Sequence, residues 1–195
     1  LYPHPPVPLN SVNTFTFLVA VVLSAQTTDG KVVNEVTSSL FQHASTPEAM
    51  SKMSSDTVQD IIKSVGLAPK KAVYLVELSK KLVSDHNSTV PASYKALESL
   101  PGVGHKTASV MMSQSFGHPA IAVDTHVHRL ANRWGLSNEK NVDKVQQDLM
   151  AVFPEETWNK LHLQMIYFGR EFCTAKDHTP SGCPICSLLA STSQL

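Results

Sequence analysis

The stretch LPGVGHKTAS, residues 100–109, places a lysine directly after a turn that contains two glycines. Glycines on both sides of Val103 let the backbone turn sharply with positive φ, and they leave N–H groups unobstructed at the amino end of a helix. The turn therefore indicates a phosphate-binding site. A tight connection between two helices with nothing bound explains the same residues.

Lys106 falls in the first turn of the helix that follows. The positive end of the helix dipole disfavours an ammonium group there, and a groove would remove water from it. Both effects favour a neutral amine, which can attack a carbon at the aldehyde level and form a Schiff base. A lysine that contacts a phosphate, or that is merely solvated, is the alternative.

Asp124 is the second candidate for catalysis. A helix over 105–116 runs ~15–18 Å away from the turn, and the extended segment AIAV, residues 120–123, returns a similar distance. We therefore expect Asp124 to lie level with Lys106, where a carboxylate can stabilise positive charge on a sugar ring or assist a proton transfer. Asp124 also has the position of an ordinary helix N-cap, and the two roles are compatible.

Helical periodicity and helix start and stop signals extend along the whole chain, which predicts an all-α fold. Asp29 is the expected cap of the second helix, and Gly66 the expected end of the third. The expected helices cover residues 13–25, 29–41, 55–66, 70–86, 93–100, 105–116, 124–133, 142–153 and 156–172.

The bulk properties exclude several classes of protein. The chain has 195 residues and a formal net charge of zero, which argues against a polybasic nucleic-acid coat, so any DNA binding needs a local surface. The apolar run over residues 15–25 is too short for a membrane span of ~20 residues, and no secretion signal is visible. We expect a cytoplasmic protein, nucleoid-associated if bacterial, with no membrane partner.

Taken together, several motifs resemble the helix-hairpin-helix DNA glycosylases, and specifically the endonuclease III family. They are LPGVGHKTAS with AVDTHVHRLANRWGL, and in family order VVLSAQTTD, SVGLAPKKA, HNSTVPASYKALESLPGVG and LHLQMIYFGREFC. The resemblance implies a helix-hairpin-helix glycosylase fold with two helical subdomains and a DNA groove between them. The expected domains are residues 11–118, with the hairpin, and 119–195 plus 1–10, with the cysteines.

The resemblance also implies an activity, that of a monomeric bifunctional DNA glycosylase and abasic-site lyase in base excision repair. Its partner would be double-stranded DNA that contains a damaged pyrimidine or an abasic site, with the damaged base rotated out of the stack. Lys106 would form the Schiff base, and β-elimination would nick the strand. Asp124 would assist departure of the base.

The implied DNA contacts extend beyond the two catalytic residues. The backbone at Gly102, Val103, Gly104 and His105 would hold a phosphate, with a bound cation as a further option. Gln26 and Leu67 match family residues that fill the space left by the flipped nucleotide. A contact at the helix end for Gln26 and core packing for Leu67 are the alternatives. Lys70 and Lys71 either contact the DNA backbone or form a solvated face.

Three cysteines, Cys173, Cys183 and Cys186, lie close together near the end of the chain and indicate a metal site rather than a disulfide. Family members often hold a 4Fe-4S cluster with four cysteines spaced C-x6-C-x2-C-x5-C. Here the first spacing is three residues longer, and Thr192 takes the fourth place.

Loss of the cluster is therefore favoured over its retention, with His178 as a substitute ligand if it is retained. A zinc site is a third option, because Cys183 and Cys186 have zinc-ligand spacing and His178 lies nearby. Packing of Ile185, Leu188 and Leu189 would hold the tail if no metal binds. No other cofactor is expected.

Two other functions stay open at this point. A glycosylase for another base, such as a mismatched thymine or uracil, would share the same motifs. A helix-hairpin-helix module that binds DNA without catalysis would share the turn, but binding alone does not need both Lys106 and Asp124.

Overall fold

The computed structural model describes residues 1–27 and 30–192, and the side chains of residues 191 and 192 are outside the description. Within this part of the chain all regular secondary structure is helical, so the all-α prediction is confirmed. None of the described helices combines the length and apolar character needed to cross a membrane. The chain divides into two compact units, which we call the hairpin unit (Val7–Phe116) and the cysteine unit (Leu1–Pro6 with Gly117–Leu195).

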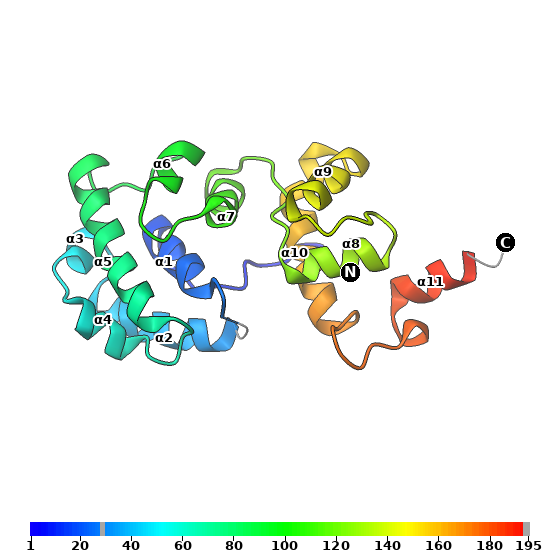
Figure 1. Ribbon diagram of the computed structural model, residues 1–195, viewed down its shortest axis with the longest axis horizontal. Coiled ribbons are helices and arrows are strands. Elements are labelled where there is room, and N and C mark those ends of the chain that lie inside the picture. Colours follow the sequence, from blue (N-terminus) through cyan, green and yellow to red (C-terminus); the bar gives the residue numbers. More distant parts are fainter. Residues whose placement is uncertain (28–29, 193–195) are drawn as a thin grey trace. The chain divides into compact units, whose positions relative to one another are not determined.

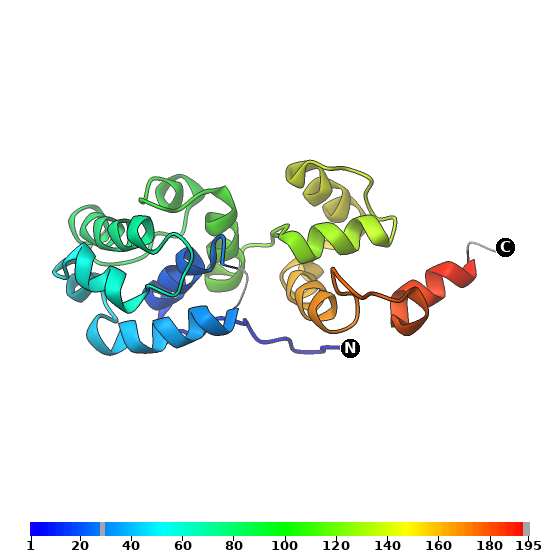
Figure 2. The same cartoon turned by 60° about the horizontal axis from the view of Figure 1, so that its bottom comes forward.

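In the hairpin unit, helix α1 is the centre of the core. Residues Phe15 to Leu23 are all buried, and α1 contacts α2, α5 and α7, as Figures 1 and 2 both show. The side chain of Asn13 caps α1 by accepting a hydrogen bond from the Thr16 N–H at 2.8 Å. The helices of this unit are α1 (Thr14–Ser24), α2 (Gly30–His43), α3 (Pro47–Ser51), α4 (Ser55–Ile61), α5 (Ala68–Asp85), α6 (Tyr94–Glu98) and α7 (His105–Phe116).

The cysteine unit is built on the packing of α8 against α10. Gly169 of α10 permits this close approach, because a Cβ there would lie 3.1 Å from side-chain atoms of both His126 and Arg129. The amino-terminal segment belongs to this unit, where the Tyr167 hydroxyl donates to Pro6 O at 3.0 Å. The unit contains α8 (Thr125–Arg133), α9 (Val142–Val152), α10 (Trp158–Glu171), α11 (Pro184–Thr192) and the 3-10 helices η1 (Glu155–Thr157) and η2 (Pro180–Gly182).

Most of the predicted helices are present, with differences at their ends. Helix α4 ends at Ile61 rather than at Gly66, because the backbone leaves the helical region at Ile62. Two helices, α3 and α11, were not predicted: α3 has five residues, too few to show a helical period, and the α11 segment was interpreted through its cysteines. The expected cap Asp29 lies outside the described residues.

Lys71 of α5 joins two parts of the hairpin unit in a way the sequence analysis did not predict. Its ammonium group is buried and donates to Leu23 O at 2.8 Å, to Thr27 Oγ1 at 3.1 Å and to Ala25 O at 2.5 Å. These oxygens lie at the carboxyl end of α1, where backbone carbonyls have no partner within the helix. Burial lowers the pKa of Lys71 below its usual value of 10.5, whereas the three acceptor oxygens favour the charged form.

Replacing Lys71 with methionine tests this interaction. The substitution keeps most of the side-chain volume but removes three hydrogen bonds at the carboxyl end of α1, of which the one to Leu23 O is buried, so we expect the free energy of unfolding to fall by about 1–3 kcal/mol. Chemical denaturation measures the free energy of unfolding of each variant. Lys80→Met, at a side chain that is 55% exposed, is the matched control and should change stability by less than about 0.5 kcal/mol. Equal stabilities of the two variants would contradict a structural role for Lys71.

Candidate functional site

The structure requires glycine at one of the two glycine positions of the predicted turn and not at the other. Gly102 has a φ of +78°, and a Cβ there would come within 2.7 Å of the Tyr74 ring. Gly104 does not have a positive φ, so the expectation of positive φ at both glycines is wrong for this one, and a Cβ at Gly104 would meet nothing within 4 Å. The folded chain therefore requires glycine at 102, while nothing in the described protein requires it at 104.

Helix α7 begins directly after this turn with unused backbone donors. The N–H of Val103 is not one of them, since it donates to Leu100 O at 3.1 Å. The N–H groups of Gly104, His105 and Lys106 donate to no described residue, as is usual in a first helical turn. They form the part of the turn that can bind an anion.

The ring of His105 is fixed beside this turn. Its Nδ1 lies 2.7 Å from Glu98 Oε1, and the ring stacks on Tyr94 with centroids 5.4 Å apart. Tyr94 and Glu98 are the first and last residues of α6, so α6 positions the start of α7.

Lys106 is the second residue of α7 and its side chain is exposed. It forms no hydrogen bond or ion pair with a described residue. We expected a groove to remove water from this amine, but the side chain is exposed. The lysine is thus placed at the helix start, with its amine accessible.

Asp124 is the N-cap of α8, as predicted. Its Oδ1 accepts a hydrogen bond from the Val127 N–H at 2.8 Å, which leaves the carboxylate half-buried and fixed in direction. Burial lowers the pKa of the nearby His126, an effect that the charge of Asp124 opposes. Lys106 and Asp124 belong to different units, so their placement at the same level stays a prediction.

Gln26 and Leu67 come from distant parts of the sequence, and the structure places their segments against each other. A Cβ on Gly66 would lie 3.0 Å from Gln26 O. Both residues adopt the left-handed region, with φ of 57° and 60°, which costs about 1–3 kcal/mol for a residue other than glycine. Such strain often marks a functional segment.

The alternatives for these two residues do not fit the structure. Leu67 is 54% exposed, so it does not pack in the core. The side chain of Gln26 is exposed and makes no hydrogen bond to a described residue. A polar and an apolar side chain are therefore both exposed on neighbouring segments of the hairpin unit.

The two neighbouring lysines differ from each other. Lys70 lies over the Tyr74 ring, with Nζ 5.6 Å from its centroid, and is exposed. Lys71 is buried, so both the DNA-contact and the solvated-face interpretations are wrong for this residue. A signal was present in the sequence, because Lys71 lies next to Ala72 and one turn before Leu75 on the apolar stripe of α5.

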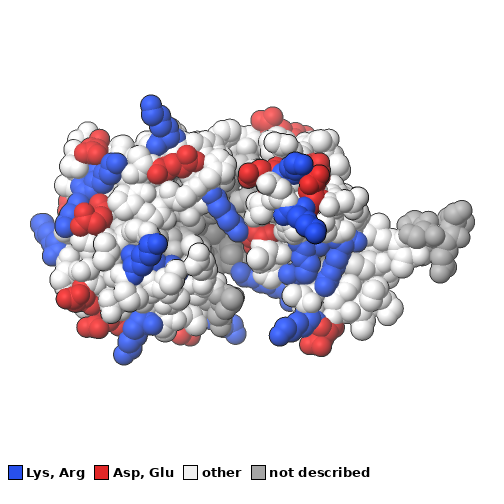
Figure 3. All heavy atoms as spheres, in the orientation of Figure 1, with Lys and Arg blue, Asp and Glu red and all other residues white. Residues whose placement is uncertain are grey.

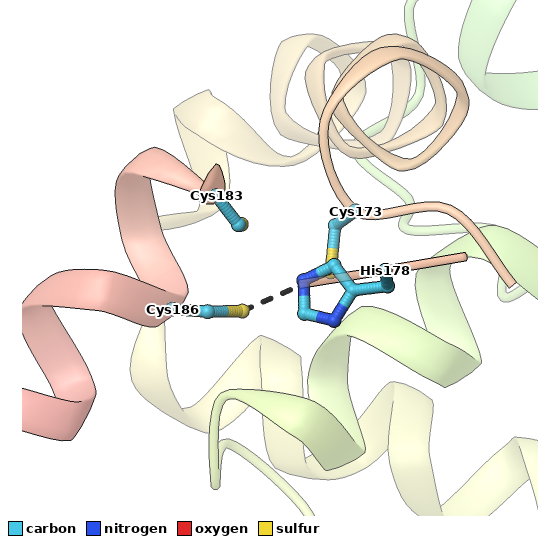
Figure 4. A group of neighbouring side chains, drawn as sticks. All are labelled: Cys173, His178, Cys183 and Cys186. Carbon is cyan, nitrogen blue, oxygen red and sulfur yellow. Dashed lines mark hydrogen bonds between the residues drawn. The ribbon is translucent and has the colours of Figure 1, made fainter. Parts of the chain in front are cut away.

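Three cysteines and a histidine converge in the cysteine unit (Figure 4). Cys173 follows α10, His178 comes from the next loop, and Cys183 and Cys186 lie at the start of α11. All ligand atoms of the four residues lie within 4.8 Å of one another, and the three thiols are not in disulfides. Burial, with hydrogen bonds that the thiol donates to Cys183 and Cys173, raises the pKa of Cys186 to about 12. The group can hold a metal ion.

Two arginines of α8 contact this group, a contact between distant segments that was not predicted. Arg133 Nη1 lies 3.4 Å from Cys173 Sγ, and Arg129 Nε donates to Cys173 O at 3.1 Å. Of the three apolar side chains expected to pack the tail, Ile185 packs against the core of this unit, whereas Leu188 and Leu189 are 67% and 37% exposed.

Charged side chains of both signs are interspersed over the visible face of each unit (Figure 3). This distribution agrees with the net charge of zero. The visible face carries no broad basic coat, so a nucleic-acid contact has to rely on local groups such as the turn before α7.

Comparisons with known proteins match this arrangement. The sequence model of the family described as "HhH-GPD superfamily base excision DNA repair protein" matches residues 19–155. The chain is 43% identical to endonuclease III of Bacillus subtilis (strain 168) over 189 residues, which cover 96% of this chain and 86% of the relative. It is 42% identical to endonuclease III of Escherichia coli (strain K12), with coverage of 94% and 86%.

A solved structure agrees with the sequence comparisons. The structure described as "Structure of a Trapped Endonuclease III-DNA Covalent Intermediate: Estranged-Adenine Complex" aligns with a TM-score of 0.90 and 38% identity, over 100% of this chain and 92% of that chain. Family model, relatives and structure agree over nearly the whole sequence. The chain belongs to the endonuclease III family of the HhH-GPD superfamily of base excision DNA repair proteins.

Proposed function

We propose that this protein is a bifunctional DNA glycosylase and abasic-site lyase that removes oxidised pyrimidines in base excision repair. The observation that carries the proposal is the exposed Lys106, placed at the amino end of α7 directly after a turn with unused N–H donors. A relative with a TM-score of 0.90 was trapped as a covalent intermediate with DNA, which supports covalent chemistry here.

In this mechanism the Lys106 amine attacks C1′ of the damaged nucleotide, and the base leaves with the electron pair of the glycosidic bond. The amine nitrogen loses a proton and then expels the ring oxygen: the C1′–O4′ bond breaks, O4′ takes up a proton, and the protonated Schiff base forms. The Schiff base draws electrons from the sugar, so a proton is lost from C2′ and the C3′–O bond breaks, with the 3′ phosphate as the leaving group. Hydrolysis then returns the lysine. The proposed role of Asp124 is to stabilise positive charge at the sugar and to assist the proton transfers.

The remaining residues would hold the DNA. The N–H groups of Gly104, His105 and Lys106 would bind a backbone phosphate at the start of α7. Gln26 and Leu67 would enter the space left by the flipped nucleotide, because both side chains are exposed on neighbouring segments and both backbones are already held in a strained conformation. We propose that the protein acts as a monomer on duplex DNA, and no step of the reaction uses the cysteine group.

Borohydride trapping tests the nucleophile. Wild-type protein is incubated with a labelled duplex that contains thymine glycol or an abasic site, and we expect a covalent band with both substrates. Lys106→Ala should form no band and still bind the duplex, while Lys80→Ala, at an exposed lysine of α5, should behave like wild type. A band from the Lys106→Ala protein would refute the role of Lys106 as the nucleophile. A wild-type band on the abasic duplex alone would support the lyase activity but show that thymine glycol is not removed, so the glycosylase would act on another base.

Two substitutions separate the capping role of Asp124 from its proposed chemistry. Asparagine remains a good N-cap but has no charge, so Asp124→Asn should keep the thermal stability and reduce the rate of base removal by about 10²–10⁴-fold. Asp124→Ala should lose the same activity and also about 1 kcal/mol of stability. Single-turnover assays on thymine glycol duplex measure the rate. A fully active Asp124→Asn protein would show that Asp124 is only a cap.

Gly104→Ala tests the phosphate contact at the turn. An added Cβ meets nothing within 4 Å and the φ is not positive, so the variant should be as stable as wild type or slightly more stable. If a phosphate approaches this backbone closely, the methyl group should raise the Kd for abasic-analogue duplex by roughly tenfold or more. An unchanged Kd would show that the backbone at Gly104 does not contact the DNA phosphate closely.

A further inference from the structure

The cysteine group differs from the ligand set of a 4Fe-4S cluster. Such a cluster is held by four thiolates, each on its own iron, and their sulfur atoms must surround eight atoms of iron and sulfide. Here three thiols and one imidazole have all their ligand atoms within 4.8 Å of one another. That space accommodates one ion and not a cluster, so the 4Fe-4S expectation does not fit the described residues.

The measured separations match a single tetrahedral ion. With Zn–S near 2.3 Å and Zn–N near 2.0 Å, tetrahedral geometry separates two sulfurs by about 3.8 Å, and sulfur from nitrogen by about 3.5 Å. Cys173 Sγ lies 3.9 Å from Cys186 Sγ and 3.6 Å from His178 Nε2. We propose that Cys173, His178, Cys183 and Cys186 bind one structural zinc ion in place of an iron–sulfur cluster.

The spacing of the four residues supports this site. His178 lies in the segment that lengthens the first interval of the family pattern, and it is centred between Cys173 and Cys183. Cys183 and Cys186 have the two-residue interval that is common in zinc sites. The added residues thus supply a fourth ligand where the chain has no fourth cysteine.

The charges around the group also suit zinc. Three thiolates and Zn²⁺ leave a net charge of −1, and a buried charge needs a partner. Arg133 donates to Cys173 Sγ at 3.4 Å and to Thr174 O at 2.6 Å, so its guanidinium is held against the site. Hydrogen bonds of this kind orient a metal ligand and stabilise the thiolate.

The site has a mechanical consequence for the end of the chain. In both cartoon views α11 extends away from α8, α9 and α10 and joins them through the ligand-bearing segment (Figures 1 and 2). Its exposed leucines contribute little packing, whereas Cys183 and Cys186 are buried. A bound ion would therefore anchor α11 to the end of α10. This inference does not rest on the proposed function, because no step of that reaction uses the ion.

The test begins with the metal content of the whole protein, purified without oxygen from cells supplied with both iron and zinc. Elemental mass spectrometry should give about one zinc ion per chain and little iron. A labile-sulfide assay should find little sulfide, and the protein should show no absorption band in the visible range. Replacement by Co²⁺ should give the absorption of a tetrahedral site with thiolate ligands, and X-ray absorption at the zinc edge should give three sulfur neighbours and one nitrogen.

His178→Ala should weaken zinc binding by more than about tenfold, measured by competition with a chromogenic chelator. His43→Ala, at an exposed histidine of the other unit, is the matched control and should bind zinc like wild type. Four iron atoms with sulfide per chain, a single iron instead of zinc, or a protein that binds neither zinc nor Co²⁺ would each overturn the inference. Borohydride trapping with the same preparation keeps the two proposals separate, since zinc-loaded protein without a trapped band would refute only the proposed function.

Discussion

The buried ammonium of Lys71 is the interaction on which the arrangement of the hairpin unit depends. It closes the carboxyl end of α1, the central helix, and ties that end to the first turn of α5. The strained residues Gln26 and Leu67 lie just outside these two helix ends, Gln26 after the C-cap of α1 and Leu67 at the N-cap of α5. One turn further along α5, Tyr74 packs against Gly102 and supports the turn before α7. Helix α5 therefore fixes both the segments that carry Gln26 and Leu67 and the turn before α7. The strained backbone of the two residues is tolerated because the surrounding packing determines their positions.

The two glycines of the turn show how a site can be built without side chains. Gly102 satisfies a demand of the fold itself, since its φ and the Tyr74 ring both exclude a larger residue. Gly104 satisfies no such demand, and the N–H groups beside it are unused in the described protein. Backbone donors at a helix start are an arrangement that binds anions in many proteins, because the dipole and the N–H directions act together. Lys106 belongs to the same first turn of α7 as these donors.

In the cysteine unit, hydrogen bonds from α8 as well as apolar packing hold the segment that follows α10. Arg129 and Arg133 of α8 bring two guanidinium groups to the carbonyl and sulfur atoms of Cys173. Arg129 also donates to Gly169 O at 2.8 Å, at the point where α8 and α10 approach most closely. Asp124 caps the other end of α8, so this short helix fixes a candidate catalytic carboxylate at its start and the metal-binding group near its end. The two sites share a support although they do not share chemistry.

The sequence by itself determined the helical fold, the start of α7 before Lys106 and the cap at Asp124, because these depend on local periodicity and on residues close in the chain. Features that arise from contacts between segments distant in the sequence were decided only by the tertiary structure. It buried Lys71, brought Gln26 beside Gly66, and gave Gly102 and Gly104 different roles. It also gathered His178 with the three cysteines into a space that fits one ion. The physical reason is the same in each case: burial, close approach and ligand distance are properties of contacts between segments, and no local pattern encodes them.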